Sequence, residues 1–311
     1  MRHHRVYADG ERALYHLGVS ESILAGQVET CVRAGLTPRT VAEGLAHLDR
    51  GDAGQVVAFS FDDGYADNMT RALPILERYG ARATCFLTAG LMESRTAPWW
   101  DELAFILEHA VIPDARVTFG GRSTSLQAMS DAGRRAALTA LLPQLRVAPA
   151  EMRARLDRLR QVLGVTEPAP CELAEWPVAR RWVDASMEVG SHTLTHPFLT
   201  TLPPGEQLRE IVGCADLIRE RLAAPVTGLA YPVGDHDEHT LEATRASGLA
   251  YAVTTEAGDC RPDSSRHRLA RRALTEGACI GPGGKYSGAM TRAELAGSFD
   301  RLRGRRQESG T

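Results

Sequence analysis

The sequence predicts an α/β fold in which parallel strands, joined by crossover helices, form a (β/α) barrel. Three observations lead to this prediction. Apolar runs of strand length alternate with stretches of helical spacing, acidic or histidine side chains follow two of these runs, and 311 residues suffice for a barrel built as one domain. We therefore expect a single domain over residues 1–311.

The first β-α-β unit brings two carboxylates to the end of a strand. The apolar run 56–61 leads directly into Asp62 and Asp63, helical spacing follows over 67–79, and a second apolar run covers 83–87. Barrels of this kind gather their chemistry at the C-terminal ends of the strands. The two aspartates therefore lie where a site is expected.

The same alternation returns in the second half of the chain. Strands are predicted at 187–191, 228–231, 250–254 and 268–274, and helices at 206–222 and 238–247. Residues 110–171 are helical in pattern, and no acid or histidine cluster follows a strand there, so we interpret them as a helical insertion beside a barrel core over about 56–274. The basic end, 301–306, is expected to be a solvated tail.

Two short motifs carry the metal hypothesis. Asp62 and Asp63 are neighbours on an extended backbone, so their side chains point to opposite sides, although a polar turn would show the same residues. His192 and His196 stand four apart after another strand, a spacing that lets both imidazoles face one ion if the segment turns helically. Helix capping or packed core histidines are the alternatives for that pair.

Combined, the motifs form a ligand set with open positions. Asp63, His192 and His196 would present two imidazoles and one carboxylate to a divalent cation, which leaves room for water and a substrate oxygen. Non-haem iron oxygenases use the same set, but on a double-stranded β fold, whereas this chain alternates β and α segments. The pattern therefore favours metal-assisted hydrolysis.

Three segments resemble a known family, in the same order along the chain. Ser60-Phe61-Asp62-Asp63-Gly64-Tyr65, Ser191-His192-Thr193-Leu194-Thr195-His196-Pro197 and Tyr231-Pro232-Val233-Gly234 are similar to the first three motifs of the polysaccharide deacetylases, carbohydrate esterase family 4. The resemblance covers about residues 56–274. It implies a distorted, incomplete (β/α) barrel and an N-deacetylation reaction.

The resemblance also implies a role for each matching residue. Asp62 becomes the general base and the backbone N–H of Val233 becomes an oxyanion donor, while Asp63, His192 and His196 become ligands of a divalent metal. Zn²⁺ is expected, with Co²⁺, Ni²⁺, Mn²⁺ and Fe²⁺ as alternatives.

The third motif departs from the family pattern. Ala230 stands where the family often has an arginine that holds the base, and the family's Leu-x-His, which supplies a general acid, has no clear match. We predict that Arg271 or Arg272, on the late strand, reaches the carboxylate of Asp62 instead. His236 and His267 are candidates for the acid, and an ordinary loop histidine is the alternative for each.

Four further residues are predicted to contact the substrate. Trp100, in the segment Pro98-Trp99-Trp100-Asp101, is an aromatic that would stack on a sugar ring or, alternatively, pack in the core. Tyr65, Tyr231 and Pro232 belong to the motifs that resemble the family, and we place them at the same site.

Composition and charge exclude other kinds of partner. A formal net charge of −3 gives no field that would gather nucleic acid, and no apolar run approaches the roughly 18 residues that span a bilayer. No apolar run of signal-peptide length precedes Gly26, and the six cysteines form no Cys-x-x-Cys pair. We therefore expect a cytoplasmic protein with reduced thiols, without a nucleic-acid partner or membrane span; its oligomeric state is not predicted.

The function that the sequence predicts is N-deacetylation of an amino sugar, in a soluble saccharide or a biosynthetic intermediate. Two alternatives remain open at this point. A cyclic amide or imide hydrolase would use the same fold, and a catalytically silent carbohydrate-binding barrel would keep the fold without turnover.

Overall fold

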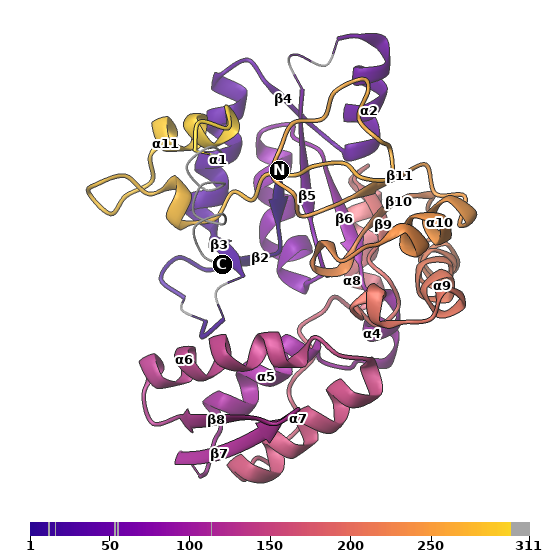
Figure 1. Ribbon diagram of the computed structural model, residues 1–311. Coiled ribbons are helices and arrows are strands. Elements are labelled where there is room, and N and C mark those ends of the chain that lie inside the picture. Colours follow the sequence, from indigo (N-terminus) through magenta and orange to yellow (C-terminus); the bar gives the residue numbers. More distant parts are fainter. Residues whose placement is uncertain (12, 16, 53, 55, 113, 300–311) are drawn as a thin grey trace.

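A curled parallel sheet forms the centre of the molecule (Figure 1). The computed structural model describes residues 1–11, 13–15, 17–52, 54, 56–112 and 114–299. The strand order is β1-β5-β6-β9-β10-β11, with β4 beside β5. The strands are β1 (Arg2–His3), β4 (Thr37–Arg39), β5 (Val56–Phe61), β6 (Ala83–Leu87), β9 (Glu188–Ser191), β10 (Val226–Ala230) and β11 (Tyr251–Val253).

Two isolated β-bridges extend the sheet toward closure of the barrel. Leu269 pairs with Val253 of β11, and Ala273 pairs with Arg2 of β1, both in parallel orientation. The segment 269–273 therefore links the last strand of the sheet to the first. The predicted distorted, incomplete (β/α) barrel is confirmed.

Helices surround the barrel, most of them as crossovers between its strands. They are α1 (Glu21–Arg33), α2 (Val41–Arg50), α3 (Leu73–Arg78), which continues a π-helical turn over Asn68–Ala72, α4 (Ala89–Ser94), α8 (Trp176–Asp184), α9 (Pro204–Leu222), α10 (Glu238–Ala246) and α11 (Gly288–Leu295). In Figure 1, α11 (yellow) lies against α1 (indigo).

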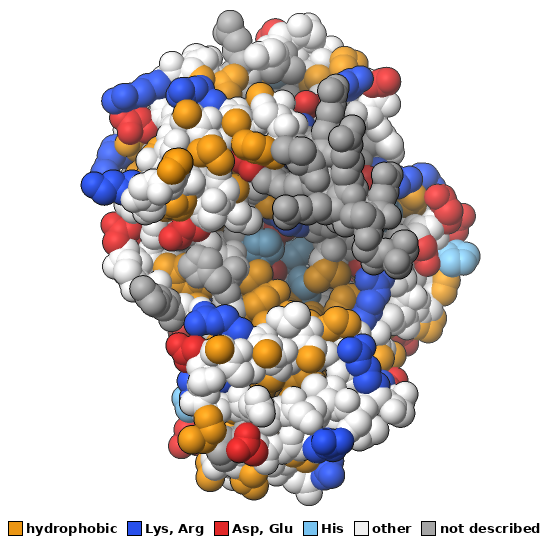
Figure 2. Space-filling model, turned by 60° about the vertical axis from the view of Figure 1, so that its left-hand side comes forward, with side chains coloured by type: hydrophobic (Ala, Val, Ile, Leu, Met, Phe, Trp, Pro, Cys, Tyr) orange, Lys and Arg blue, Asp and Glu red, His pale blue; other side chains and the backbone are white. Residues whose placement is uncertain are grey.

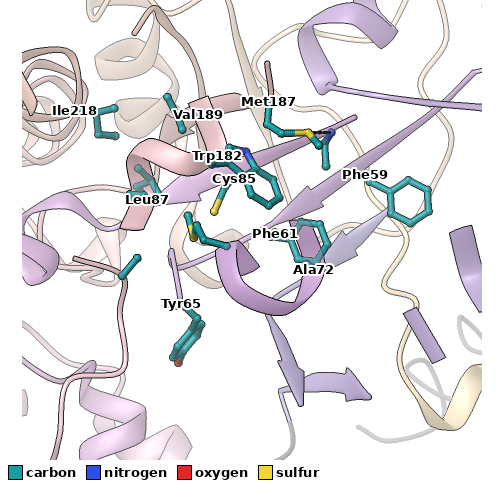
Figure 3. Packing of buried hydrophobic residues seen from close by; sticks show 14 of the residues in the cluster. Phe59, Phe61, Tyr65, Ala72, Cys85, Leu87, Trp182, Met187, Val189 and Ile218 are labelled. Carbon is teal, nitrogen blue, oxygen red and sulfur yellow. Dashed lines mark hydrogen bonds between the residues drawn. The ribbon is translucent and has the colours of Figure 1, made fainter. Parts of the chain in front are cut away.

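Strand alternation separates the core from the site. On β5, Phe59 and Phe61 face the surrounding helices, and the Phe61 ring meets Trp182 of α8 edge-on with a centroid distance of 5.7 Å (Figure 3). Side chains alternate between the two faces of a strand. Ser60, and Asp62 just beyond the strand, therefore point into the barrel.

Close packing fills the barrel near the N-terminal ends of its strands. A Cβ built on Gly228 of β10 would lie 2.1 Å from the Tyr251 ring, so only glycine leaves room for that ring. The Tyr251 hydroxyl donates to Glu188 Oε1 at 2.8 Å. This end of the barrel is packed, which leaves the C-terminal ends of the strands for a pocket.

The insertion contains a β-hairpin that the sequence analysis did not predict. It comprises α5 (Trp99–Glu108), the antiparallel strands β7 (Asp114–Phe119) and β8 (Arg122–Gln127), α6 (Asp131–Leu141) and α7 (Pro149–Leu163). Gly120 and Gly121 form the two-residue turn, both with positive φ, which is the signature of a tight hairpin. The insertion has a hydrophobic core of its own and lies below the barrel in Figure 1.

The barrel begins earlier than predicted. The expected core over 56–274 omits β1 and β4, which both pair with β5. A small parallel pair, β2 (Arg5–Tyr7) and β3 (Gly18–Ser20), follows β1. The basic segment 301–306 lies outside the described residues. Within the part of the chain that the structure describes, no helix combines the length and the apolar character needed to cross a bilayer.

Candidate active site

The three predicted metal ligands converge at the C-terminal ends of two neighbouring strands. Asp63 follows β5, and His192 and His196 follow β9; all three are buried, and their ligand atoms lie within 4.8 Å of one another. The Nε2 atoms of His192 and His196 are 3.3 and 3.6 Å from Asp63 Oδ1. Because the spacing admits one small ion between the three atoms, the arrangement fits a divalent cation.

A hydrogen bond orients the His192 imidazole, and burial keeps the His196 imidazole neutral. His192 Nδ1 lies 2.7 Å from the carbonyl oxygen of Ala230, which favours a proton on Nδ1 and leaves Nε2 to face Asp63. Burial and the neighbouring His192 lower the pKa of His196 to about 3. His196 is therefore neutral near pH 7, and the neutral imidazole is the form that ligates metals.

The backbone is bent sharply at the ligands. Asp63 has φ of 77° and His196 has φ of 55°, in the left-handed region that non-glycine residues seldom occupy. Thr193, between the two histidines, has φ of 66°. Its hydroxyl accepts a hydrogen bond from the N–H of His196 at 3.1 Å. The tight turn thus brings His196 back beside His192, with ring centroids 4.8 Å apart, without an intervening helix.

Arg271 holds the second aspartate from the late segment of the barrel. Its Nη1 and Nη2 donate to Oδ1 and Oδ2 of Asp62 at 2.7 and 2.8 Å, and its remaining donors bind Ser60 Oγ and the carbonyl oxygen of Thr254, both at 2.9 Å. Asp62 is 2% exposed and Arg271 is 5% exposed. The contact predicted for Arg271 or Arg272 is made by Arg271, whereas its neighbour Arg272 pairs with Asp259.

The ion pair keeps the Asp62 carboxyl ionised. Burial acts to raise the pKa of this group, but the charge and hydrogen bonds of Arg271 outweigh burial and hold the pKa well below its usual range. A bidentate guanidinium also fixes the plane of the carboxylate. Asp62 is therefore an oriented, negatively charged acceptor next to the three ligands.

These residues line one pocket of about 350 Å³. Its wall includes Asp62, Asp63, His192, His196, Trp100 and Val233, together with Arg2, His4, Tyr15, Leu17, Trp99 and Thr255. Figure 2 shows a hollow between the barrel and the insertion, with histidine side chains visible in its floor. The volume lies in the lower part of the range for small-molecule sites.

Of the predicted substrate contacts, the structure places only Trp100 on the pocket wall. Tyr65 is fully buried; its hydroxyl donates to Asp101 at 2.8 Å and accepts from the Trp100 indole N–H at 2.8 Å. Tyr231 is also fully buried, and its hydroxyl lies against Thr244 and the carbonyl oxygen of His267. Pro232 is buried next to it. The turns that follow β5 and β10 direct these side chains into the core, and the Tyr65 hydroxyl holds the Trp100 indole from behind the pocket wall.

The third motif presents Val233 to the pocket. Val233 has φ of 50° and is 47% exposed, because the turn over Pro232–Gly234 pushes it outward. Gly234 permits this turn: a Cβ there would lie 2.1 Å from the Thr255 hydroxyl. Val233 therefore lines the pocket, and the role of its backbone N–H as an oxyanion donor stays a prediction.

Two residues of the first strand line the pocket and were missed from the sequence. Arg2 is on β1 and His4 directly follows β1, with His3 between them. Because every second side chain of an extended backbone points to the same side, both point into the barrel. Burial lowers the pKa of His4, against the opposing effect of Asp63 and Asp62. The signal was the alternation Arg2-His3-His4, but a two-residue strand is too short to be recognised by periodicity.

The two histidines proposed as acids lie elsewhere. His236 stacks on the Tyr231 ring, and its Nδ1 lies 2.8 Å from the carbonyl oxygen of Gly234. His267 Nε2 lies 3.0 Å from the carbonyl oxygen of Leu249. Neither side chain is part of the pocket wall. Among the described residues of the pocket wall, His4 is thus the imidazole that remains after the two ligands.

Comparison with known proteins identifies sequence relatives of this chain. The family described as polysaccharide deacetylase matches residues 49–252. YxkH of Bacillus subtilis (strain 168), whose name places it among the polysaccharide deacetylases, is 24% identical over 255 residues, which are 82% of this chain and 64% of that protein. The chain thus spans less than two thirds of that relative.

Solved structures share the fold. The Streptococcus pyogenes deacetylase PplD in complex with acetate matches with a TM-score of 0.58 at 17% identity, over 89% of this chain and 92% of that one. IcaB from Ammonifex degensii matches with a TM-score of 0.56 at 18% identity, over 89% and 91%. With the family match covering more than half of the sequence, the chain belongs to the polysaccharide deacetylase family.

Proposed function

We propose that this chain is a divalent-metal-dependent N-deacetylase that hydrolyses the acetamide of an N-acetylated amino sugar. One observation carries the proposal: the convergence of Asp63, His192 and His196 beside Asp62, within a single pocket. Two imidazole nitrogens and one carboxylate oxygen form a mixed ligand set that suits Zn²⁺, with Co²⁺, Ni²⁺, Mn²⁺ and Fe²⁺ as alternatives. A bound cation would polarise the acetamide carbonyl and lower the pKa of a water molecule.

Asp62 would be the general base. The reaction requires a group that accepts a proton from the attacking water, and Asp62 is ionised, oriented and in the pocket. Arg271 occupies both carboxylate oxygens with one hydrogen bond each, and each oxygen keeps further lone pairs for a water proton. Arg271 is thus a positioning residue for the base.

His4 would protonate the leaving amine. Cleavage of an amide needs a proton on the departing nitrogen, and an imidazole in the pocket can take up a proton during the reaction and pass it to that nitrogen. His192 and His196 are assigned to the metal, which leaves His4 as the pocket histidine for this step. The backbone N–H of Val233 would stabilise the negative charge that develops on the carbonyl oxygen.

Trp100 would form one wall for the sugar. Its ring lies 4.2 Å from the His196 ring, and its indole N–H is fixed by Tyr65. An aromatic face held next to the metal ligands would stack on the pyranose ring. We propose a soluble saccharide or a biosynthetic intermediate as substrate and a cytoplasmic location, which cell fractionation would test.

The decisive experiment separates ligand from base. Purified protein is stripped with a chelator, titrated with each divalent ion, and assayed for acetate release from N-acetylglucosamine oligosaccharides. Asp62→Asn should retain the ion and lose about 10²- to 10⁴-fold in turnover. Asp63→Asn, a matched change at the neighbouring position, should lose the ion itself. Equal metal loss in both variants would contradict the assignment.

The same assay addresses the two alternatives. A cyclic imide offered in place of the acetylated sugar would be opened only if the protein is an imide hydrolase. Saccharide binding without acetate release, with every ion tried, would indicate a silent binding barrel. Failure to bind any divalent ion would refute the proposal as a whole.

A further inference from the structure

The catalytic pocket contains an arginine, Arg2, whose side chain has no partner among the described residues. Arg2 lies on β1, paired with Ser60 of β5 on one side and with Ala273 on the other, and its side chain lines the pocket beside His4 and Tyr15. Its Nε is buried, and the guanidinium makes no hydrogen bond or ion pair with any residue that the structure describes.

The carboxylates of the pocket do not require Arg2. Asp62 has both of its oxygens hydrogen-bonded to Arg271, and Asp63 faces the imidazoles of His192 and His196. Each acid therefore has its own counter-charge or ligand role. With Asp62 paired to Arg271, the remaining charges of the pocket are those of Arg2 and Asp63, and a divalent ion on the ligands would make the pocket net positive.

An unpaired, partly buried charge is costly, because the protein replaces only part of the lost hydration. Desolvation by burial lowers the pKa of Arg2, in line with this cost. A bound anion would remove it. The guanidinium group presents a planar fork of donors that matches carboxylate and phosphate oxygens, which is why arginine is preferred for these groups.

We propose that the substrate is an anionic N-acetylated amino sugar, and that Arg2 binds its carboxylate or phosphate. This inference rests on the proposed N-deacetylation and names the class of sugar that the same pocket takes. Arg2 on β1 and His4 directly after β1 both line the pocket, so the anionic substituent would lie near the leaving nitrogen. In this role Arg2 selects the substrate and takes no part in the proton transfers.

The kinetic test compares matched substrates. Acetate release is measured from N-acetylglucosamine 1-phosphate and N-acetylmuramic acid, which carry phosphate and carboxylate, and from neutral N-acetylglucosamine. Wild-type protein should prefer at least one of the anionic sugars, and the preferred one identifies the group that Arg2 recognises. Arg2→Met should lower the anionic-to-neutral ratio of kcat/KM by about 30- to 100-fold, mainly through KM. Arg2→Lys should fall between the two.

A matched control removes one arginine charge from a surface outside the pocket. Arg116, on the exposed face of β7 in the insertion, lies far along the chain from the pocket wall, and Arg116→Met should leave the ratio unchanged. Equal losses on anionic and neutral sugars in Arg2→Met, or a wild-type preference for the neutral sugar, would overturn the assignment while the proposed deacetylation stands.

A binding experiment tests the anion site separately from the proposed deacetylation. Glucose 1-phosphate and glucuronic acid, which have no amide, are titrated into metal-free wild-type protein and into Arg2→Met and Arg2→Lys, with binding followed by NMR chemical-shift changes. Saturable binding that Arg2→Met abolishes and Arg2→Lys weakens supports the anion site even if no sugar is deacetylated. Absence of binding to wild-type protein, or binding that persists in Arg2→Met, refutes it.

Discussion

Removal of Arg271 should destabilise the protein by more than any surface ion pair. Arg271→Met deletes four hydrogen bonds, two of them to Asp62, and leaves that carboxylate buried without a cation. Breaking a buried pair from one side costs about 3–5 kcal/mol. This is a large part of the roughly 5–15 kcal/mol by which folded domains are stable.

The cost should depend on the charge of Asp62. The Asp62→Asn/Arg271→Met double variant removes both charges, so it should regain about 1–4 kcal/mol over Arg271→Met alone. Because the folded-state pKa of Asp62 is depressed, the pair stabilises the fold above pH 3.8 and loses this effect as pH falls below that value. The gap between wild type and Arg271→Met should therefore narrow in acid.

Urea denaturation in the presence of a chelator measures these differences without a metal contribution. Arg271→Lys should resemble Arg271→Met more than wild type, since an ammonium cannot supply the two parallel hydrogen bonds. Arg221→Met, which breaks the exposed pair with Glu93, is the control and should cost far less. A loss below about 1 kcal/mol for Arg271→Met, or no rescue in the double variant, would refute the reasoning from burial.

Three further predictions concern the rest of the barrel. His4→Asn should keep the metal and lose about 10²- to 10⁴-fold in turnover, measured as acetate release at saturating metal; unchanged turnover would remove His4 from the proton-transfer step. Burial lowers the pKa of His3 to about 3, so acid must destabilise the fold as the unfolded chain takes up a proton below pH 6.5. His3→Leu should flatten that dependence by up to about 1.4 kcal/mol per pH unit, and denaturation curves at pH 7 and pH 4.5 check it. Gly228→Ala should cost about 1–3 kcal/mol because its Cβ would overlap Tyr251, whereas Gly205→Ala, where a Cβ would meet nothing within 4 Å, should not; equal stability of the two variants contradicts the packing.

The sequence predicted well those parts of the fold in which one periodicity extends over several residues. The apolar runs 56–61 and 83–87 are strands with the expected bounds, and the helices at 206–222 and 238–247 are present within two residues at each end. Long regular segments carry enough repeats for the period to be read.

Short or irregular pieces carry no such repeat. β1 has two residues, so nothing in its sequence separates it from a loop, and its place in the sheet depends on pairing with β5. The hairpin around Gly120 and Gly121 had a recognisable turn signal, but a neighbourhood rich in alanine and arginine favoured helix. Because β1 was not recognised, Arg2 and His4 were missing from the predicted site.

Residue identity predicted the centre of the site better than its walls. Metal ligands and bases are restricted to a few side-chain types with fixed spacing, so Asp63 and the two histidines could be proposed from the motifs alone. Substrate contacts depend on which face of the turn after a strand a side chain occupies. A motif does not specify that face, and Tyr65 and Tyr231 consequently proved to be core residues.

The replaced arginine shows how packing inside the barrel can move a functional group without losing it. Ala230 is fully buried beside Phe86, Val253 and Leu269, and its carbonyl oxygen is 2.7 Å from His192 Nδ1, so the β10 position cannot hold a long side chain while this packing persists. The guanidinium comes instead from Arg271, on the segment that closes the sheet between β11 and β1, and its centre lies 5.6 Å from the Phe86 ring. Ala230 packs in the cluster that contains Phe86, and the Arg271 guanidinium lies over the same ring, so the small residue at 230 and the arginine at 271 adjoin one side chain while only the arginine reaches Asp62.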